Sequence, residues 1–232
     1  TVVEINKAVK ENTLGQEVEL AKAFDYASQN NKSVHFIGLV SDGGVHAHIE
    51  HLKSLLTTAS EAGLKNVFVH AFTDGRDTDP KSGLHFLTDL YQHTLKTNTQ
   101  IATVTGRYFA MDRDNRWERV ALAYNAMVHG TGDVSQDVLA SIAKSYADGV
   151  TDEFIKPVIM INDDGTPKGN IESGDVVICF NFRTDRGREI TQALTQKEFP
   201  EQGMKPLDLY YLTMTEYDKE FKGVHVIFND SN

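Results

Sequence analysis

Short apolar segments rich in β-branched residues alternate along this chain with longer segments whose apolar residues recur at helical spacing. Such alternation is typical of an α/β fold. The sequence predicts a mixed, mostly parallel sheet flanked by helices. We expect a single domain, because 232 residues suffice for one sizeable core. The predicted strands span residues 34–40, 67–72, 100–105, 157–161, 176–182, 207–214 and 224–228.

Four of these strands run directly into turns rich in polar residues, at 41–46, 74–77, 106–119 and 181–189. Ligands of α/β sheets bind outside the carboxyl ends of strands, so we expect the four turns to converge on one edge. Gly43 and Gly44 in the first turn allow backbone N–H groups to approach an anion closely. An ordinary capped turn is the alternative interpretation of this segment.

Helical patterns follow the turns, at about 46–62, 81–95 and 134–146. Asp79 is the expected N-cap of the second of these helices, with Pro80 in its first turn. Residues 106–119 contain many charges and aromatic rings, which predicts a segment that is neither core nor a flexible linker.

Arginine is confined to three short segments, although the net charge of the chain is −10. Guanidinium groups suit planar, bidentate recognition of carboxylate and phosphate. An acidic chain is a poor partner for nucleic acid, so a local anion pocket is the preferred interpretation, with structural ion pairs as the alternative. The arginines are Arg76; Arg107, Arg113, Arg116 and Arg119; and Arg183, Arg186 and Arg188.

The spacing of these arginines predicts a clamp around an anion. Arg183 and Arg186 are three apart at an expected helix start, so both can face one ligand. Arg107 and Arg113 flank an irregular segment and can contact the ligand from the other side. Phosphate together with carboxylate is the simplest dianion for such a pocket.

His46 is a candidate hydrogen-bond donor or general acid–base group, because an imidazole titrates near neutrality. Asp77 or Asp74 is a candidate base, although cationic neighbours lower a carboxyl pKa and make it a weaker base. No nucleophile motif of the G-x-S-x-G type, no Walker A sequence and no dinucleotide fingerprint is present.

A metal-dependent hydrolase that uses His46, His48, His51 and Asp42 is a second hypothesis. The H-x-H-x-x-H spacing lacks the further acidic ligands that such an enzyme needs, and His48 and His51 can simply be solvated. Cys179, the only cysteine, lies in an apolar run and is predicted to be a buried small hydrophobe. The single cysteine and the lack of a signal-peptide pattern or a membrane-spanning run predict a cytoplasmic location.

Four motifs, in order, resemble the cofactor-independent (2,3-bisphosphoglycerate-independent) phosphoglycerate mutase family. They are GLVSDGGVHAHIEHL, HAFTDGRDTDP, TVTGRYFAMDRDNRWERV and FNFRTDRGRE. The resemblance covers only the inserted phosphotransferase, or substrate-binding, domain of that family. It implies a glycolytic isomerase that interconverts 3-phosphoglycerate and 2-phosphoglycerate through a phosphoserine formed in a companion domain that resembles alkaline phosphatase.

The resemblance also implies roles for individual residues. Asp77 corresponds to a proposed acid–base group for the glycerate hydroxyls, and Arg116, Arg119 and Arg188 become structural. Two manganese ions, the nucleophilic serine and a substrate-binding lysine belong to the companion domain, so no metal is expected in this chain. The implied substrate ligands are His46, Arg76, Asp77, Arg107, Arg113, Arg183 and Arg186.

The chain begins at Thr1 without methionine, which is typical of a processed product or an excised piece. We expect residues 1–8 to form an interdomain linker or helix and residues 9–212 to form the substrate-binding domain. Residues 213–232 are expected to form the return linker and the start of the companion domain. Alone, the chain is predicted to be a monomer without mutase turnover. A stand-alone binding module for phosphorylated acids is the alternative.

Overall fold

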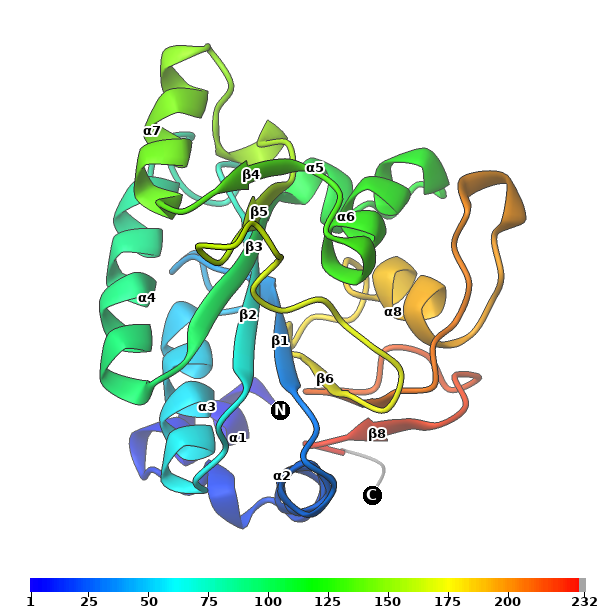
Figure 1. Ribbon diagram of the computed structural model, residues 1–232. Helices are drawn as coiled ribbons and strands as arrows, with labels where there is room; N and C mark the ends of the chain where they lie inside the picture. The colour runs from blue at the N-terminus through cyan, green and yellow to red at the C-terminus, as the bar shows by residue number, and fades with distance from the viewer. Residues whose placement is uncertain (230–232) are drawn as a thin grey trace.

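An eight-stranded sheet runs through the residues that the computed structural model describes, 1–229 (Figure 1). Residues 230–232, the end of the predicted return linker, lie outside this description. The predicted mixed, mostly parallel sheet is confirmed. Its strands are β1 (Val34–Leu39), β2 (Val67–Thr73), β3 (Gln100–Gly106), β4 (Asp133–Ser135), β5 (Val158–Met160), β6 (Val176–Cys179), β7 (Tyr210–Thr213) and β8 (Val224–Val226).

The strand order is β4-β5-β3-β2-β1-β6-β7-β8, and only β3 and β5 pair antiparallel. β1, β2 and β6 are buried at every position. Strands that are buried along their whole length are expected where helices cover both faces of a parallel sheet. Cys179 lies at the end of β6 and is fully buried, as predicted.

Eight α-helices within residues 1–229 flank the sheet. They are α1 (Val2–Lys10), α2 (Val18–Asn30), α3 (Ile49–Glu61), α4 (Gly83–Thr97), α5 (Arg107–Ala110), α6 (Trp117–His129), α7 (Val138–Ala147) and α8 (Arg188–Thr195). Figure 1 shows α3 and α4 side by side on one face, and α6 and α8 on the other. α1 packs against α3, and α7 packs against α4. None of the described helices has the length and apolar character needed to cross a membrane.

β1 is the switch point of the sheet, because strands are added first on one side of it and later on the other. From β1 the chain adds β2 and β3 on one side, and it later adds β6 and β7 on the other. Open α/β sheets bind ligands at such switch points, outside the carboxyl ends of the strands. The topology therefore directs attention to the turns that follow β1, β2, β3 and β6.

Two predicted helix boundaries are wrong, because partners distant in sequence determine them. The segment expected to be helical from Val134 begins as β4, which pairs with β5, and only then becomes α7. The helix expected to start after Asp79 starts at Gly83, whose backbone N–H donates to Asp152 Oδ2 over 2.7 Å. Asp152 lies 69 residues further along, so the local sequence does not reveal this cap.

A buried chain of polar side chains crosses the centre of the sheet. His35 Nε2 lies 2.8 Å from Asp175 Oδ2, and His35 Nδ1 lies 2.9 Å from His70 Nε2. His70 Nδ1 in turn lies 2.9 Å from Thr103 Oγ1. Burial, and then the charge of His35, hold the pKa of His70 well below its usual range. A fully satisfied buried network of this kind favours one register of the central strands.

Replacing Asp175 by alanine removes the acceptor at the end of this chain and leaves a buried ring N–H of His35 without a partner. We expect Asp175→Ala to lower the free energy of unfolding by about 1–3 kcal/mol, measured by urea denaturation. Asp208→Ala, at an exposed aspartate before β7, should change it by less than about 0.5 kcal/mol. Equal effects of the two substitutions would contradict the role given to the network.

Candidate functional site

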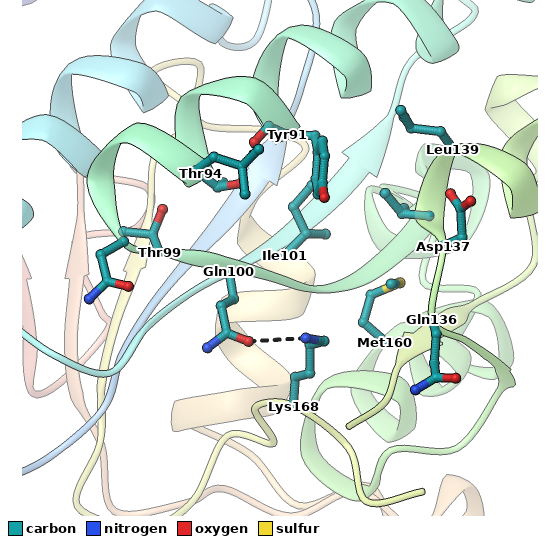
Figure 2. A pocket seen from close by; sticks show the side chains of 13 residues that line it. Tyr91, Thr94, Thr99, Gln100, Ile101, Gln136, Asp137, Leu139, Met160 and Lys168 are labelled. Carbon is teal, nitrogen blue, oxygen red and sulfur yellow. Dashed lines mark hydrogen bonds between the residues drawn. The ribbon is translucent and has the colours of Figure 1, made fainter. Parts of the chain in front are cut away.

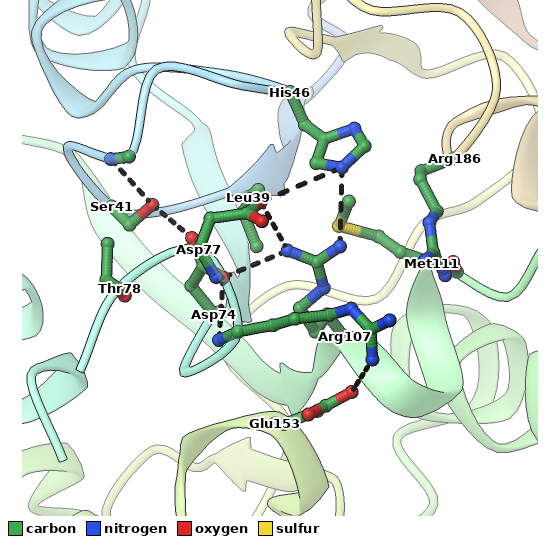
Figure 3. A network of polar contacts seen from close by, with 12 residues as sticks. Leu39, Ser41, His46, Asp74, Asp77, Thr78, Arg107, Met111, Glu153 and Arg186 are labelled. Carbon is green, nitrogen blue, oxygen red and sulfur yellow. Dashed lines mark hydrogen bonds and ion pairs between the residues drawn. The ribbon is translucent and has the colours of Figure 1, made fainter. Parts of the chain in front are cut away.

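The polar turns after β1, β2, β3 and β6 meet at one edge of the sheet, as predicted (Figure 3). Arg107, which follows β3, contacts Asp74 and Asp77 after β2 and His46 after β1. The turn after β6 joins this group because Arg186 Nη1 donates to the Met111 carbonyl over 3.1 Å. The convergence follows from the parallel strands, whose carboxyl ends all point to this edge.

Arg107 is the centre of the group and is only 2% exposed. Its Nη1 lies 2.9 Å from Asp74 Oδ1 and 2.8 Å from Asp77 Oδ2, and its Nη2 lies 3.3 Å from His46 Nε2. The expectation that residues 106–119 are not core is therefore wrong for Arg107. A guanidinium can be buried here because two carboxylates compensate its charge.

Asp74 holds the second turn in place. One of its carboxylate oxygens accepts a 2.6 Å hydrogen bond from the Ser41 hydroxyl, and the other accepts from the backbone N–H groups of Arg76 and Asp77. Burial raises the pKa of Asp74, but these hydrogen bonds and Arg107 outweigh burial and leave the pKa below its usual range. Asp74 is therefore a permanently ionised anchor and a poor general base.

His46 is neutral at physiological pH, although it lies between two carboxylates. Burial, and then the positive charge of Arg107, lower its pKa to about 4. A guanidinium can only donate, so the ring nitrogen that faces Arg107, Nε2, must be the acceptor. The single ring proton is then on Nδ1, which lies 3.7 Å from Asp185 Oδ1.

Four further arginines surround this core. Arg76, Arg113 and Arg183 have half-exposed side chains and ion pairs of 3.3–3.5 Å, Arg76 with Glu153 and the other two with Asp185. Burial, followed by repulsion from Arg107, Arg113 and Arg76, lowers the pKa of Arg186. These guanidinium groups are therefore close enough to repel one another, and an anionic ligand would relieve that repulsion.

The helical spacing expected for Arg183 and Arg186 is wrong, because α8 begins only at Arg188. Both residues lie in the preceding turn, held by backbone hydrogen bonds from the N–H groups of Phe182 and Arg183 to the His46 carbonyl, at 2.8 and 3.3 Å. The turn nevertheless places both arginines at the site, because β6 ends beside β1.

A buried pair of carboxyl groups, which the sequence analysis missed, joins the turn after β3 to α8. Glu189 is 6% exposed and accepts from the Asn115 N–H at 3.1 Å, and Asp112 accepts from the N–H groups of Asp114 and Arg116. Burial, followed by the hydrogen bond with Asp112, raises the pKa of Glu189 to about 8. Glu189 therefore holds a proton at neutral pH, which lets the two acids lie together.

The arginines expected to be structural make local contacts. Arg116 Nε lies 2.6 Å from Glu118, Arg188 Nε donates to the Tyr217 carbonyl, and Arg119 lies over the Tyr108 ring at 3.9 Å. The seven predicted ligands are therefore Arg107 itself and six residues of the same sheet edge, of which His46 and Asp77 contact it directly.

The three histidines of the first turn have different hydrogen-bond partners and do not converge on one point. His48 accepts from the Glu50 N–H at the start of α3, and His51 is buried with a ring nitrogen 2.7 Å from Asn6 Oδ1. The expectation of a solvated His51 is wrong because α1 covers it. Among residues 1–229 no cluster of His, Cys, Asp and Glu is arranged to hold a metal ion, which contradicts the metal-hydrolase hypothesis.

A cavity of about 660 Å³ lies away from these turns, between the end of α4, the start of β3 and α7 (Figure 2). It is lined mostly by apolar and neutral polar side chains, and Lys168 in its wall donates to Gln100. Without convergent arginines it has none of the anion-binding character of the sheet edge, which remains the candidate site.

The fold and the site define an α/β domain with a cluster of arginines at the switch point of its sheet. The family model described as BPG-independent PGAM N-terminus (iPGM_N) matches residues 5–219, and the chain belongs to this family. This confirms the family resemblance of the four motifs.

Relatives named 2,3-bisphosphoglycerate-independent phosphoglycerate mutase align with the entire chain. The protein of Flavobacterium psychrophilum is 54% identical over 231 residues, and that of Parabacteroides distasonis is 50% identical over 232. The chain spans 46% of the length of each. A solved structure of Leishmania mexicana phosphoglycerate mutase at low cobalt concentration is similar in fold, with a TM-score of 0.86 and 31% sequence identity. The match covers 93% of the present chain and 41% of the Leishmania chain.

The protonated Glu189 predicts a pH dependence of stability. Its pKa rises from 4.5 in the unfolded chain to about 8 in the fold, so its stabilising effect is complete below pH 4.5 and is lost as pH rises through 8. Compared with Glu189→Gln, the wild type should lose up to about 1.4 kcal/mol of unfolding free energy per pH unit in this window. Urea unfolding at several pH values measures the difference. Glu201→Gln, at an exposed glutamate, is the control. If the unfolding free energies of the wild type and Glu189→Gln change with pH in parallel, the assignment of a protonated Glu189 is contradicted.

Proposed function

We propose that this chain is the substrate-binding domain of a phosphoglycerate mutase and that its arginine site binds 3-phosphoglycerate and 2-phosphoglycerate. The observation that carries the proposal is geometric: the four turns bring the guanidinium groups of five arginines to one edge of the sheet. They are Arg76, Arg107, Arg113, Arg183 and Arg186. A phosphate and a carboxylate on one small molecule match such a group of guanidiniums. The names of the relatives favour the same substrates.

In this proposal the chain binds and orients the substrate while a companion domain performs the phosphoryl transfer. Arg76, Arg113, Arg183 and Arg186 hold the anionic groups, and Arg107 with Asp74 fixes the geometry. Asp77 takes the proton from the glycerate oxygen that receives the phosphoryl group and returns one to the oxygen that loses it. Its side chain is 20% exposed and lies 3.7 Å from His46 Nε2, so unlike the buried Asp74 it can contact a ligand, which supports this role.

The phosphoserine and the two manganese ions of the proposed enzyme are assigned to the companion domain. The described residues offer no metal-binding cluster, so they do not fit such ions and no step of the present proposal uses them. We therefore propose that the chain alone has no mutase turnover.

Residues 1–8 and 213–232 are proposed as the connections to the companion domain. Thr1 and Asn229 line the same cavity as Phe182 and Thr184, so both segments lie beside the turn that carries Arg183. This arrangement supports a companion domain placed next to the arginine site.

Calorimetric titration of this chain with 3-phosphoglycerate tests the proposal. Arg183→Ala should weaken binding at least about tenfold, because it removes charged hydrogen-bond donors. Arg116→Ala, at an exposed arginine paired with Glu118, should leave binding unchanged. Inorganic phosphate should bind more weakly than 3-phosphoglycerate. Equal binding of both ligands, or equal effects of both substitutions, would contradict the proposed site.

A further inference from the structure

The segment that carries Arg113 is held at both ends by residues of the chain after β6. Arg186 Nη1 donates to the Met111 carbonyl over 3.1 Å at the start of this segment. Glu189, in the first turn of α8, accepts from the Asn115 backbone N–H over 3.1 Å near its end. Arg113 lies between these two contacts, so both of them restrict where its backbone can lie.

The backbone of this segment turns sharply at Asn115. Its φ of 58° is left-handed, a conformation that few non-glycine residues adopt. Asp112 completes the turn, because its Oδ2 accepts from the backbone N–H groups of Asp114 and Arg116 over 3.0 and 2.9 Å. Asp112 is 3% exposed, so two buried acids, Asp112 and Glu189, fix the backbone around Arg113.

The two acids can share this buried place only when one of them carries a proton. Glu189 Oε1 is shielded from solvent, and no group within residues 1–229 donates a hydrogen bond to it. Carboxylate oxygens only accept, so a hydrogen bond between Glu189 and Asp112 requires a proton on one of them. Burial, and then this contact, raise the pKa of Glu189 to about 8. At neutral pH Glu189 is therefore the donor.

The other charged groups around the pair do not replace that proton. Asp114 adds negative charge from the same segment and raises the pKa of Glu189 further. Arg119 of α6 pairs with Asp112, with its Nη1 3.6 Å from Oδ1. Arg188, the neighbour of Glu189 in α8, donates to a backbone carbonyl beyond β7. Ionised Glu189 would thus face two carboxylates, and their repulsion would push the segment away from α8.

We propose that Glu189 is a positioning residue: its carboxyl group holds the segment that carries Arg113 against the chain that carries Arg186. The inference rests on the proposed function, because it treats these two arginines as ligands of one anion. Glu189 is only 6% exposed, so it acts through the arginines rather than on the ligand. It keeps two guanidinium groups at the spacing that a small dianion requires, which sets the affinity of the site.

Calorimetric titration with 3-phosphoglycerate at pH 7 compares two substitutions at this position. Glu189→Gln keeps an acceptor for the Asn115 N–H and a donor for Asp112, so it should bind within about twofold of the wild type. Glu189→Ala removes both and should bind about tenfold more weakly. Glu201→Gln, at an exposed glutamate, is the control. If Glu189 acted only through its charge, the two neutral variants would bind equally, and that result overturns the proposal.

The pH profile of binding separates positioning from a general effect on stability. Between pH 7 and pH 9 the wild type should lose up to about tenfold in affinity, because ionised Glu189 becomes the major form above pH 8. Glu189→Gln should keep its affinity over this range. Parallel profiles of the two proteins overturn the inference while the proposed function stands. Failure of the wild type to bind 3-phosphoglycerate at any pH overturns both.

The contact itself is read from the backbone amide resonance of Asn115, without ligand. This resonance should shift as pH rises through 8 in the wild type and stay constant in Glu189→Gln, because only the wild type has a carboxyl group that ionises at this amide. The measurement also decides the case if Glu189→Ala does not fold. A wild-type resonance that stays constant overturns the proposal.

Discussion

A buried guanidinium compensated by two carboxylates organises this edge of the molecule. Arg107 bridges Asp74 and Asp77 and donates to His46, so one side chain connects three of the four turns. Burying a charge is costly unless it is paired and fully hydrogen-bonded, and removing one partner of such a group destabilises it strongly. Burial, and then the charge of Arg107, lower the pKa of His46, and the contact with Arg107 fixes the tautomer of its ring. The electrostatics of the whole site thus depend on Arg107.

The sequence predicted the location of the site because that location follows from topology. Polar turns at the ends of parallel strands must meet at one edge, and the arginines of this chain are concentrated in such turns. Arg183 was expected at the start of a helix, which is wrong because α8 begins only at Arg188. Its place directly after β6, the neighbour of β1, was enough to predict that it lies at this edge. The strand periodicity of β1, β2, β3 and β6 was therefore the most informative signal.

Contacts between residues distant in sequence could not be predicted in this way. The sequence next to Arg107 does not indicate that its side chain is buried, because its partners lie 30–61 residues away along the chain. The cap that Asp152 provides for α4 and the raised pKa of the buried Glu189 likewise arise only when separate turns pack together.

Hydrogen exchange in an Arg107→Met variant tests the central claim most directly, because methionine fills similar space without charge. The backbone amides of Arg76 and Asp77 donate to Asp74, which the variant would leave without its guanidinium partner. We expect these two amides to exchange faster than in the wild type, while the amides of β1 and β2 stay protected. Unchanged protection of Arg76 and Asp77 would contradict the claim that Arg107 holds the site together.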